Sequence, residues 1–427
     1  MTRHSKQILL GGVAVAAVAT AVAFGTSSGS AQPFSDTDPA TAPIPAYDYD
    51  DPARSFVVQA DFTADHATVT DVTVGMGRSR SHLGDPAQLE LRLRDAGDQV
   101  LQRIDSRDPR WVLQETAGGG EQQVVRPGPG ILVTPFDADA ESMVVFDNDA
   151  GQVLTTVDLA PAIRDYCLDH PDDAQCVEAD LAVQSTTATG DTFSVVGATT
   201  PLHVATTVAN LGPDGPVDAT VTEQVSVPQG VTVTPADGTW HAAGLAVGTP
   251  QEHSSTYDVT CTEPGSHTVT VTSTIAADRA KVADPVAGND TGTTQLTIDC
   301  AVPVALDVKP GTDPNPVNVR EAIIPMAVLT TSAGERGLPV AFDATRIRAA
   351  SVRIGNRADL VGSNAGVPES HGRVHLEDVD RDGDTDGVLH AAGRQIPVTT
   401  STTELCVRGT TSDGLSFFGC DHVVVVP

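Results

Sequence analysis

An alternation of apolar and polar residues, interrupted by turn residues, recurs along this chain and most constrains its fold. Residues 67–74 (ATVTDVTV) and 88–93 (QLELRL) alternate with a period of two. In an extended strand this period places one face against a core and the other in water. Aromatic residues make up only 4% of the chain, whereas Thr, Val, Asp, Gly and Pro are abundant. This composition favours strands and turns over long helices.

The chain is too long for one typical domain, and turn clusters divide it into several β units. The turn at 147–151 lies between two strand-like runs in a hairpin pattern, and GPDGP at 212–216 is a strong turn cluster. About seven strands spaced by turns over some 120 residues fit an immunoglobulin-like sandwich. We therefore predict an all-β protein of tandem immunoglobulin-like β-sandwich domains. The predicted segments are a signal peptide at 1–31, a disordered linker at 32–52, a β-sandwich of unknown type at 53–160, a disulfide-closed connector at 161–178, an immunoglobulin-like β-sandwich at 179–300 and a calcium-loop β domain at 301–427.

The N-terminus has the pattern of an export signal. Basic side chains lie among the first six residues, an apolar run follows at 8–24, and the small residues Gly29 and Ala31 offer a cleavage site. The alternative is an uncleaved anchor, because about 17 apolar residues is the lower limit for spanning a bilayer. We expect cleavage, no membrane span in the mature chain, and a secreted, extracellular or cell-surface location.

The formal net charge of -31 restricts the classes of partner. Nucleic-acid phosphates require neutralisation by Lys and Arg, so this charge argues against nucleic acid. It also disfavours docking on anionic membrane surfaces. The expected partner is an unidentified cell-surface or extracellular molecule.

Six cysteines indicate an oxidising compartment. The chain has no C-x-x-C pair, which argues against a zinc ribbon or a thioredoxin-type site. Fifteen pairings are formally open, and a reactive thiol is the functional alternative. The distribution of the cysteines along the chain favours neighbours, that is Cys167–Cys176, Cys261–Cys300 and Cys406–Cys420.

The segment 378–386 (DVDRDGDTD) carries the clearest chemistry in the sequence. Carboxylates occupy its first, third, fifth, seventh and ninth positions, and Gly383 at the sixth permits a sharp turn. Such clustered charges repel one another unless a cation lies among them, and Ca²⁺ prefers this type of oxygen-rich loop. The alternative is an ordinary Asp-Gly turn with solvated acids. The predicted Ca²⁺ ligands are Asp378, Asp380, Asp382, Asp384 and Asp386.

Three parts of the chain resemble known families. Residues 307–315 (DVKPGTDPN), 324–329 (IPMAVL), 375–380 (HLEDVD) and 388–390 (VLH) resemble a C-terminal β module of secreted bacterial proteins. Residues 209–214 (ANLGPD) and the strands around them are similar to bacterial adhesion-related, CARDB-like immunoglobulin-like repeats. For residues 53–160 we recognise no family.

The acidic loop also resembles the calcium hairpins of integrin-type propeller blades. That resemblance implies ligation by the side chains of Asp378, Asp380, Asp382 and Asp386 and by the backbone oxygen of Asp384. Strands expected at 373–376 and 388–390 agree with a hairpin setting. The loop departs from a helix-loop-helix calcium site, because Leu389 stands where that site needs a bidentate Glu.

The remaining candidate sites are weaker. GTSSG at 25–29 matches the nucleophile-elbow pattern but lies at the end of the export signal, without the required strand and helix. His371 and His375 share one face of a strand and could hold a transition metal; with no third ligand evident, a polar strand face is the preferred interpretation. Trp111 and Trp240 are interpreted as core residues and not as a sugar platform.

These observations predict a secreted or surface-associated calcium-binding protein with an adhesion or interaction role and no catalytic activity. The competing hypothesis is an accessory or substrate-binding part of a secreted hydrolase, with residues 53–160 as the substrate-binding or catalytic unit. A pocket of convergent polar side chains there would favour it. A polysaccharide-binding protein is a third class, against which the low aromatic content counts.

Overall fold

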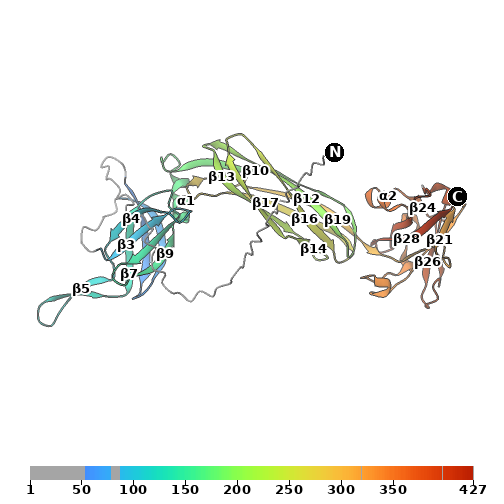
Figure 1. Ribbon diagram of the computed structural model, residues 1–427, viewed down its shortest axis with the longest axis horizontal. Helices are drawn as coiled ribbons and strands as arrows, with labels where there is room; N and C mark the ends of the chain where they lie inside the picture. The colour runs from blue at the N-terminus through green and yellow to red at the C-terminus, as the bar shows by residue number, and fades with distance from the viewer. Residues whose placement is uncertain (1–52, 78–86, 319, 397, 427) are drawn as a thin grey trace, which may run out of the picture.

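The computed structural model describes residues 53–77, 87–318, 320–396 and 398–426. The predicted signal peptide and linker, and with them the GTSSG segment, lie outside these residues. Most of the described chain is strand, and its sheets form β-sandwich-like modules that follow one another along the longest axis (Figure 1). The expected all-β class is confirmed. The described residues contain no helix that combines the length and the apolar character needed to cross a membrane.

The N-terminal module consists of two antiparallel sheets and a separate hairpin. Its strands alternate buried and exposed side chains, and Phe56, Leu91 and Met143 are fully buried between the sheets. The first sheet has the order β2 (Ala67–Met76), β1 (Arg54–Phe62) and β7 (Gly128–Pro135). The second has the order β4 (Val100–Ser106), β3 (Leu89–Arg94), β8 (Ser142–Asp147) and β9 (Gln152–Asp158). The hairpin pairs β5 (Trp111–Glu115) with β6 (Glu121–Val125).

A helix, α1 (Ala160–Asp169), opens the connector, which the sequence analysis had expected to be only a short disulfide-closed elbow. Pro161 lies in the first turn, where a missing backbone N–H costs nothing and the fixed φ suits a helix. Ala162, Ile163, Tyr166 and Cys167 are buried, which is the three-to-four-residue spacing of one helix face. The helix forms because this face packs against the core of the N-terminal module.

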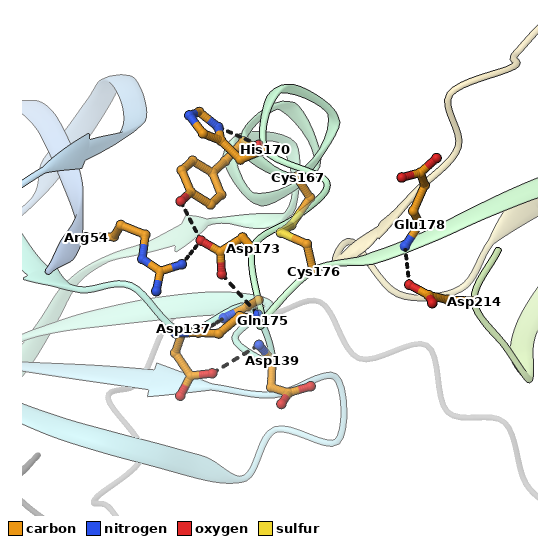
Figure 2. The surroundings of a disulfide bond; sticks show 12 residues. Arg54, Asp137, Asp139, Cys167, His170, Asp173, Gln175, Cys176, Glu178 and Asp214 are labelled. Carbon is orange, nitrogen blue, oxygen red and sulfur yellow. Dashed lines mark hydrogen bonds and ion pairs between the residues drawn. A yellow bond between two sulfur atoms is a disulfide. The ribbon is translucent and has the colours of Figure 1, made fainter. Parts of the chain in front are cut away.

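The Cys167–Cys176 disulfide closes this connector, and an ion pair fixes it to the N-terminal module. Figure 2 shows Arg54 of β1 and Asp173 pointing toward one another beside the disulfide, where they form a half-buried ion pair. The hydroxyl of Tyr166 donates a 2.6 Å hydrogen bond to the same Asp173 carboxylate. Just after the connector, at the start of the middle module, the backbone N–H of Glu178 donates to Asp214 of the same module at 3.2 Å.

The middle module is a two-sheet sandwich of long strands. In β13 (Val217–Ser226) buried and exposed residues alternate along almost the whole strand, as period-two patterning predicts. One sheet has the order β14 (Val231–Thr234), β16 (Gln251–Cys261), β12 (Thr199–Pro213), β10 (Val177–Gly190) and β18 (Val282–Ala283). The other has the order β15 (Asp237–Leu245), β13 (Val217–Ser226), β17 (Gly265–Ala277) and β19 (Thr291–Pro303), with β11 (Phe193–Val195) beside β19. The Cys261–Cys300 disulfide links β16 to β19, so it joins the two sheets.

The C-terminal module shares a strand with the middle one. β19 continues past residue 300 and pairs with β28 (Ser416–Val426) through Val302 and Pro303, so the expected boundary at 300/301 falls inside one strand. From β28 the sheet extends through β27 (Glu404–Thr410), β23 (Arg353–Gly355) and β24 (Val367–Pro368), and β21 (Asn315–Asn318) pairs with β28. A second sheet has the order β20 (Leu306–Val308), β22 (Ile324–Val328), β26 (Asp386–Ala391) and β25 (His375–Glu377). The short helix α2 (Arg357–Gly362) packs beside β27 and β23.

Candidate metal centre

The acidic segment forms the loop of the hairpin between β25 and β26. The two strands are antiparallel and their last pair is Glu377 with Asp386. Gly383 has a φ of 101°, a conformation that L side chains rarely adopt. Arg381 also has a positive φ, of 66°. The loop thus curls as its glycine position indicated, between the hairpin strands expected on either side.

Three of the five predicted carboxylates converge. Asp378, Asp380 and Asp386 each offer one oxygen, and these oxygens lie within 4.8 Å of one another. Asp378 is exposed, Asp380 is half-buried and Asp386 is completely buried. The structure therefore brings together the first, third and ninth loop positions, whereas Asp382 and Asp384 lie outside this group.

Asp386 is held by backbone donors from two segments. Its Oδ1 accepts a 2.8 Å hydrogen bond from the N–H of Thr330, and its Oδ2 accepts a 2.9 Å bond from the N–H of Val379. The hydroxyl of Thr330 also donates to the carbonyl of Thr385 at 2.6 Å. Asp386 consequently closes the loop and fastens it to the chain that follows β22.

The other loop acids are partly satisfied by protein groups. Arg336, in a 3-10 turn at Glu335–Gly337, forms a 2.6 Å ion pair with Asp380. The carboxylate of Asp382 accepts a 3.0 Å hydrogen bond from the N–H of Asp384. Among the described residues, Arg336 is thus the one basic side chain in an ion pair with a carboxylate of the loop, and the segment stays strongly negative.

Asp384 has the least favourable environment in the loop. Its Oδ1 is buried and has no hydrogen-bond partner among the described residues. Burial, together with the charges of Asp382, Asp386 and Asp380, raises the pKa of Asp384 to about 6. A raised pKa means that the carboxylate is destabilised in the folded chain, and a bound cation would remove that cost.

A group of three histidines lies at the other end of the same hairpin. The sequence analysis found His371 and His375 without a third ligand; the structure adds His390 of β26. His375 pairs with Val388 in the hairpin register, and two residues further along a strand a side chain returns to the same face. The missed residue could have been found from the register, since His390 is diagonal to His375 once the strands are paired.

The cysteines form the three expected disulfides. Their Cα–Cα distances are 5.4 Å for Cys167–Cys176, 5.8 Å for Cys261–Cys300 and 4.0 Å for Cys406–Cys420. Cys406 and Cys420 lie close to Glu404, but as disulfide sulfurs they are not thiolate ligands. All six cysteines are therefore structural.

The N-terminal module has a cavity of about 310 Å³ in which two of the lining acids bind an arginine. It is lined by Asp108 and Asp147, which both bind the buried guanidinium of Arg110. Arg110 also donates to the carbonyl of Ala64 at 2.9 Å. The hydrogen bonds that Arg110 donates to the carboxylate of Asp108 raise the pKa of Arg110. The arrangement is a buried ion-pair network that ties strands together.

The two tryptophans are half-buried and do not form an aromatic strip. Trp240 packs against the core of the middle module and stacks on His253, with ring centroids 4.8 Å apart. Trp111 lies at the base of the β5–β6 hairpin.

No protein-family model matches this chain, and no curated protein matches it. Among solved structures, the CARDB domain of a Pyrococcus furiosus protein in complex with di-metal ions is 17% identical, covers 29% of this chain and 94% of its own, and has a TM-score of 0.20. The BSP domain of a biofilm-associated protein is 8% identical over 87% of this chain and 76% of its own, with a TM-score of 0.18. Red sea bream transglutaminase is 11% identical over 76% and 41%, with a TM-score of 0.20. At these scores the likenesses say nothing about which ligand or partner this chain binds.

Proposed function

We propose that this chain is a secreted or surface-associated calcium-binding protein with a non-catalytic role in adhesion or interaction. The observation that carries the proposal is the convergence of Asp378, Asp380 and Asp386 on one hairpin. Beside them lies Asp384, whose buried Oδ1 has no hydrogen-bond partner in the described part of the chain.

The spacing of the three carboxylates suits one Ca²⁺ ion. Calcium binds oxygens at about 2.3–2.6 Å, so two oxygens on the same ion are at most ~5 Å apart. The three carboxylate oxygens are within 4.8 Å of one another. The integrin-type resemblance adds the side chain of Asp382 and the carbonyl of Asp384 as further ligands. When the ion binds, the carboxylate of Asp380 would coordinate it, and the ion pair between Asp380 and Arg336 would break.

Calcium would act on the fold of the C-terminal module through β26. This strand lies inside its sheet, between β22 and β25, and its first residue is the buried Asp386. An ion bound to the folded loop and not to the unfolded chain stabilises by about 1.4 to 2.7 kcal/mol at ten to a hundred times its Kd. The proposed role of calcium is therefore to stiffen a module that is presented to a partner.

Exposed apolar residues on the β5–β6 hairpin support an interaction role. This hairpin projects from the N-terminal module (Figure 1). Leu113 and Val125 are 60% and 48% exposed on it. Apolar side chains on a projecting element are typical of contact surfaces. We propose an extracellular or cell-surface macromolecule as the partner.

The hydrolase hypothesis has less support from the N-terminal module. Two acids that line its cavity, Asp108 and Asp147, both bind the buried guanidinium of Arg110 and so belong to an ion-pair network. A catalytic carboxylate instead needs a position facing substrate and a pKa suited to proton transfer. We therefore favour the interaction role.

Titration calorimetry of the chelator-treated mature chain with CaCl₂ tests the calcium proposal. We expect stoichiometric heat, and a loss of this heat in the double variant Asp378→Asn and Asp380→Asn. Neither residue is fully buried, so the variant should fold, and circular dichroism checks this. Glu252→Gln, which removes an exposed acid from β16, is the matched control. Equal heats in the double variant and the control, or no heat from the wild type at millimolar calcium, would refute the proposal.

A further inference from the structure

The three histidines of the β25–β26 hairpin form a compact group of imidazoles. Ring centroids of His371 and His390 are 4.4 Å apart, those of His375 and His390 are 4.9 Å apart, and those of His371 and His375 are 5.4 Å apart. One ring nitrogen of each lies within 4.8 Å of the others. Two of the residues come from adjacent strands and the third from the turn before β25, so the group exists only in the folded hairpin.

The nitrogen spacing matches a tetrahedral metal site. Nδ1 of His371 is 3.2 Å from Nε2 of His375. Two nitrogens bound to one zinc ion at about 2.0–2.1 Å, with a tetrahedral angle between them, are ~3.3 Å apart. A hydrogen bond between the two rings would have a similar length, but it would not account for the position of the His390 ring beside both of them. Nδ1 of His390 is buried and has no hydrogen-bond partner among the described residues.

A buried carboxylate fixes the backbone that carries these rings. Glu369 is 6% exposed and accepts hydrogen bonds from the N–H of Arg373 at 3.1 Å and the N–H of His390 at 3.2 Å. The N–H of Ser370 also donates to the carbonyl of His390 at 2.8 Å. The chain on either side of His371 is thereby tied to β26. The histidines are thus held in place before any ligand arrives.

The charged neighbours of the group are compatible with a cation. Oε1 of Glu369 lies 3.9 Å from Nδ1 of His390, beyond hydrogen-bonding range, and supplies a negative charge at the edge of the site. The exposed Arg373 donates to Nε2 of His375 at 3.4 Å, a long hydrogen bond that a metal would displace.

We propose that His371, His375 and His390 bind a divalent transition-metal ion of the zinc class. Three imidazole ligands leave a fourth position for water or for a ligand from a partner molecule. Imidazole nitrogens select such ions, whereas the carboxylates of the acidic loop select calcium. The hairpin would then carry two different ions, one at its loop and one beside its strands. The histidine site rests on its own geometry and does not depend on the calcium proposal.

The test is titration calorimetry with ZnCl₂ at pH 7.5 on the chelator-treated mature chain, in excess calcium so that the acidic loop does not compete. We expect one zinc ion per chain. The single variants His371→Ala and His390→Asn should bind more than about tenfold more weakly, because even the loss of an outer-shell partner typically costs 10- to 100-fold. His203→Ala, an exposed histidine on β12, is the matched control and should bind as the wild type does.

Cobalt substitution provides a second readout that does not depend on affinity. The wild type with Co²⁺ should give the intense visible absorption of a four-coordinate ion, and His371→Ala should lose it. Zinc binding that is equal in the His371, His390 and His203 variants would overturn the proposal, as would the absence of stoichiometric heat. Circular dichroism and thermal unfolding of His371→Ala without added metal show whether the variant is folded, whatever the outcome at the acidic loop.

Discussion

The fold lowers the pKa of some carboxyl groups in this chain and raises that of others. Asp139 lies beside Lys281 at 2.7 Å and Arg279 at 3.3 Å, and the hydrogen bond from Lys281 lowers its pKa. Asp290, in contrast, is partly buried near Asp284 and Asp180, and its Oδ1 has no hydrogen-bond partner among the described residues. Burial, followed by the charge of Asp284, raises the pKa of Asp290 to about 6. Asp139 forms ion pairs that join the N-terminal module to the middle module. Asp290, when ionised, destabilises the middle module.

The raised pKa of Asp290 predicts a pH dependence of stability. The folded chain holds this proton more tightly than the unfolded chain, whose pKa is near 3.8. The stabilisation is therefore fully present below pH 3.8 and is lost as the pH rises through about 6. We expect Asp290→Asn to be more stable than the wild type at pH 7.5, with a difference that shrinks toward pH 4.5. Urea unfolding in EDTA at several pH values measures this, and a difference that is constant with pH would contradict it.

Among the elements of the fold, the β25–β26 hairpin and its flanking turn carry both the acidic group and the histidine group. Asp386 belongs both to the proposed calcium ligands and to the hydrogen bonds that attach the loop to Thr330. Asp378, in contrast, is exposed, and its side chain accepts no hydrogen bond from the other described residues. Substitution of Asp386 and substitution of Asp378 should therefore change the stability of the calcium-free chain by different amounts.

This difference gives a prediction for the hairpin. Asp386→Asn replaces an acceptor oxygen with an amide that cannot accept from both backbone donors, so it should destabilise the chain by about 1–3 kcal/mol even in EDTA. Asp378→Asn should leave stability in EDTA unchanged and lower it only in calcium. Chemical unfolding of both variants, with and without calcium, separates the two roles. An Asp386→Asn variant as stable as the wild type in EDTA would contradict the structural role of Asp386.

Local sequence patterns predicted the elements of this hairpin better than its long-range contacts. The alternation of residues indicated the strands, and Gly383 indicated the turn, because both signals are local. The third histidine depends on how β26 pairs with β25, which no local pattern specifies. Helix α1 was missed because its buried face is recognisable only once the N-terminal core is present. Cys406 and Cys420 were paired correctly, and they lie directly opposite each other in β27 and β28.

At the scale of the whole molecule, contacts between the modules are specific. Ala280 and Ala283 of the middle module pack into the core cluster of the N-terminal one. At the second joint the guanidinium of Arg408 lies 3.5 Å from the ring centroid of Phe193, and Ser416 donates to Asp299 at 2.6 Å. These contacts and the shared strand β19 couple each module to the next. Ions that stabilise the C-terminal hairpin would therefore stabilise one end of a connected array.

The measurement that tests the account most directly is thermal unfolding of the mature chain across a calcium titration, with zinc absent. The proposed calcium site predicts that the melting temperature of the chain rises with calcium and falls again with chelator. It also predicts that the double variant Asp378→Asn and Asp380→Asn melts at one temperature in both conditions, while Glu252→Gln behaves as the wild type. A melting temperature of the wild type that is independent of calcium, or a double variant that keeps the full response, would contradict the assignment of the hairpin as a calcium site.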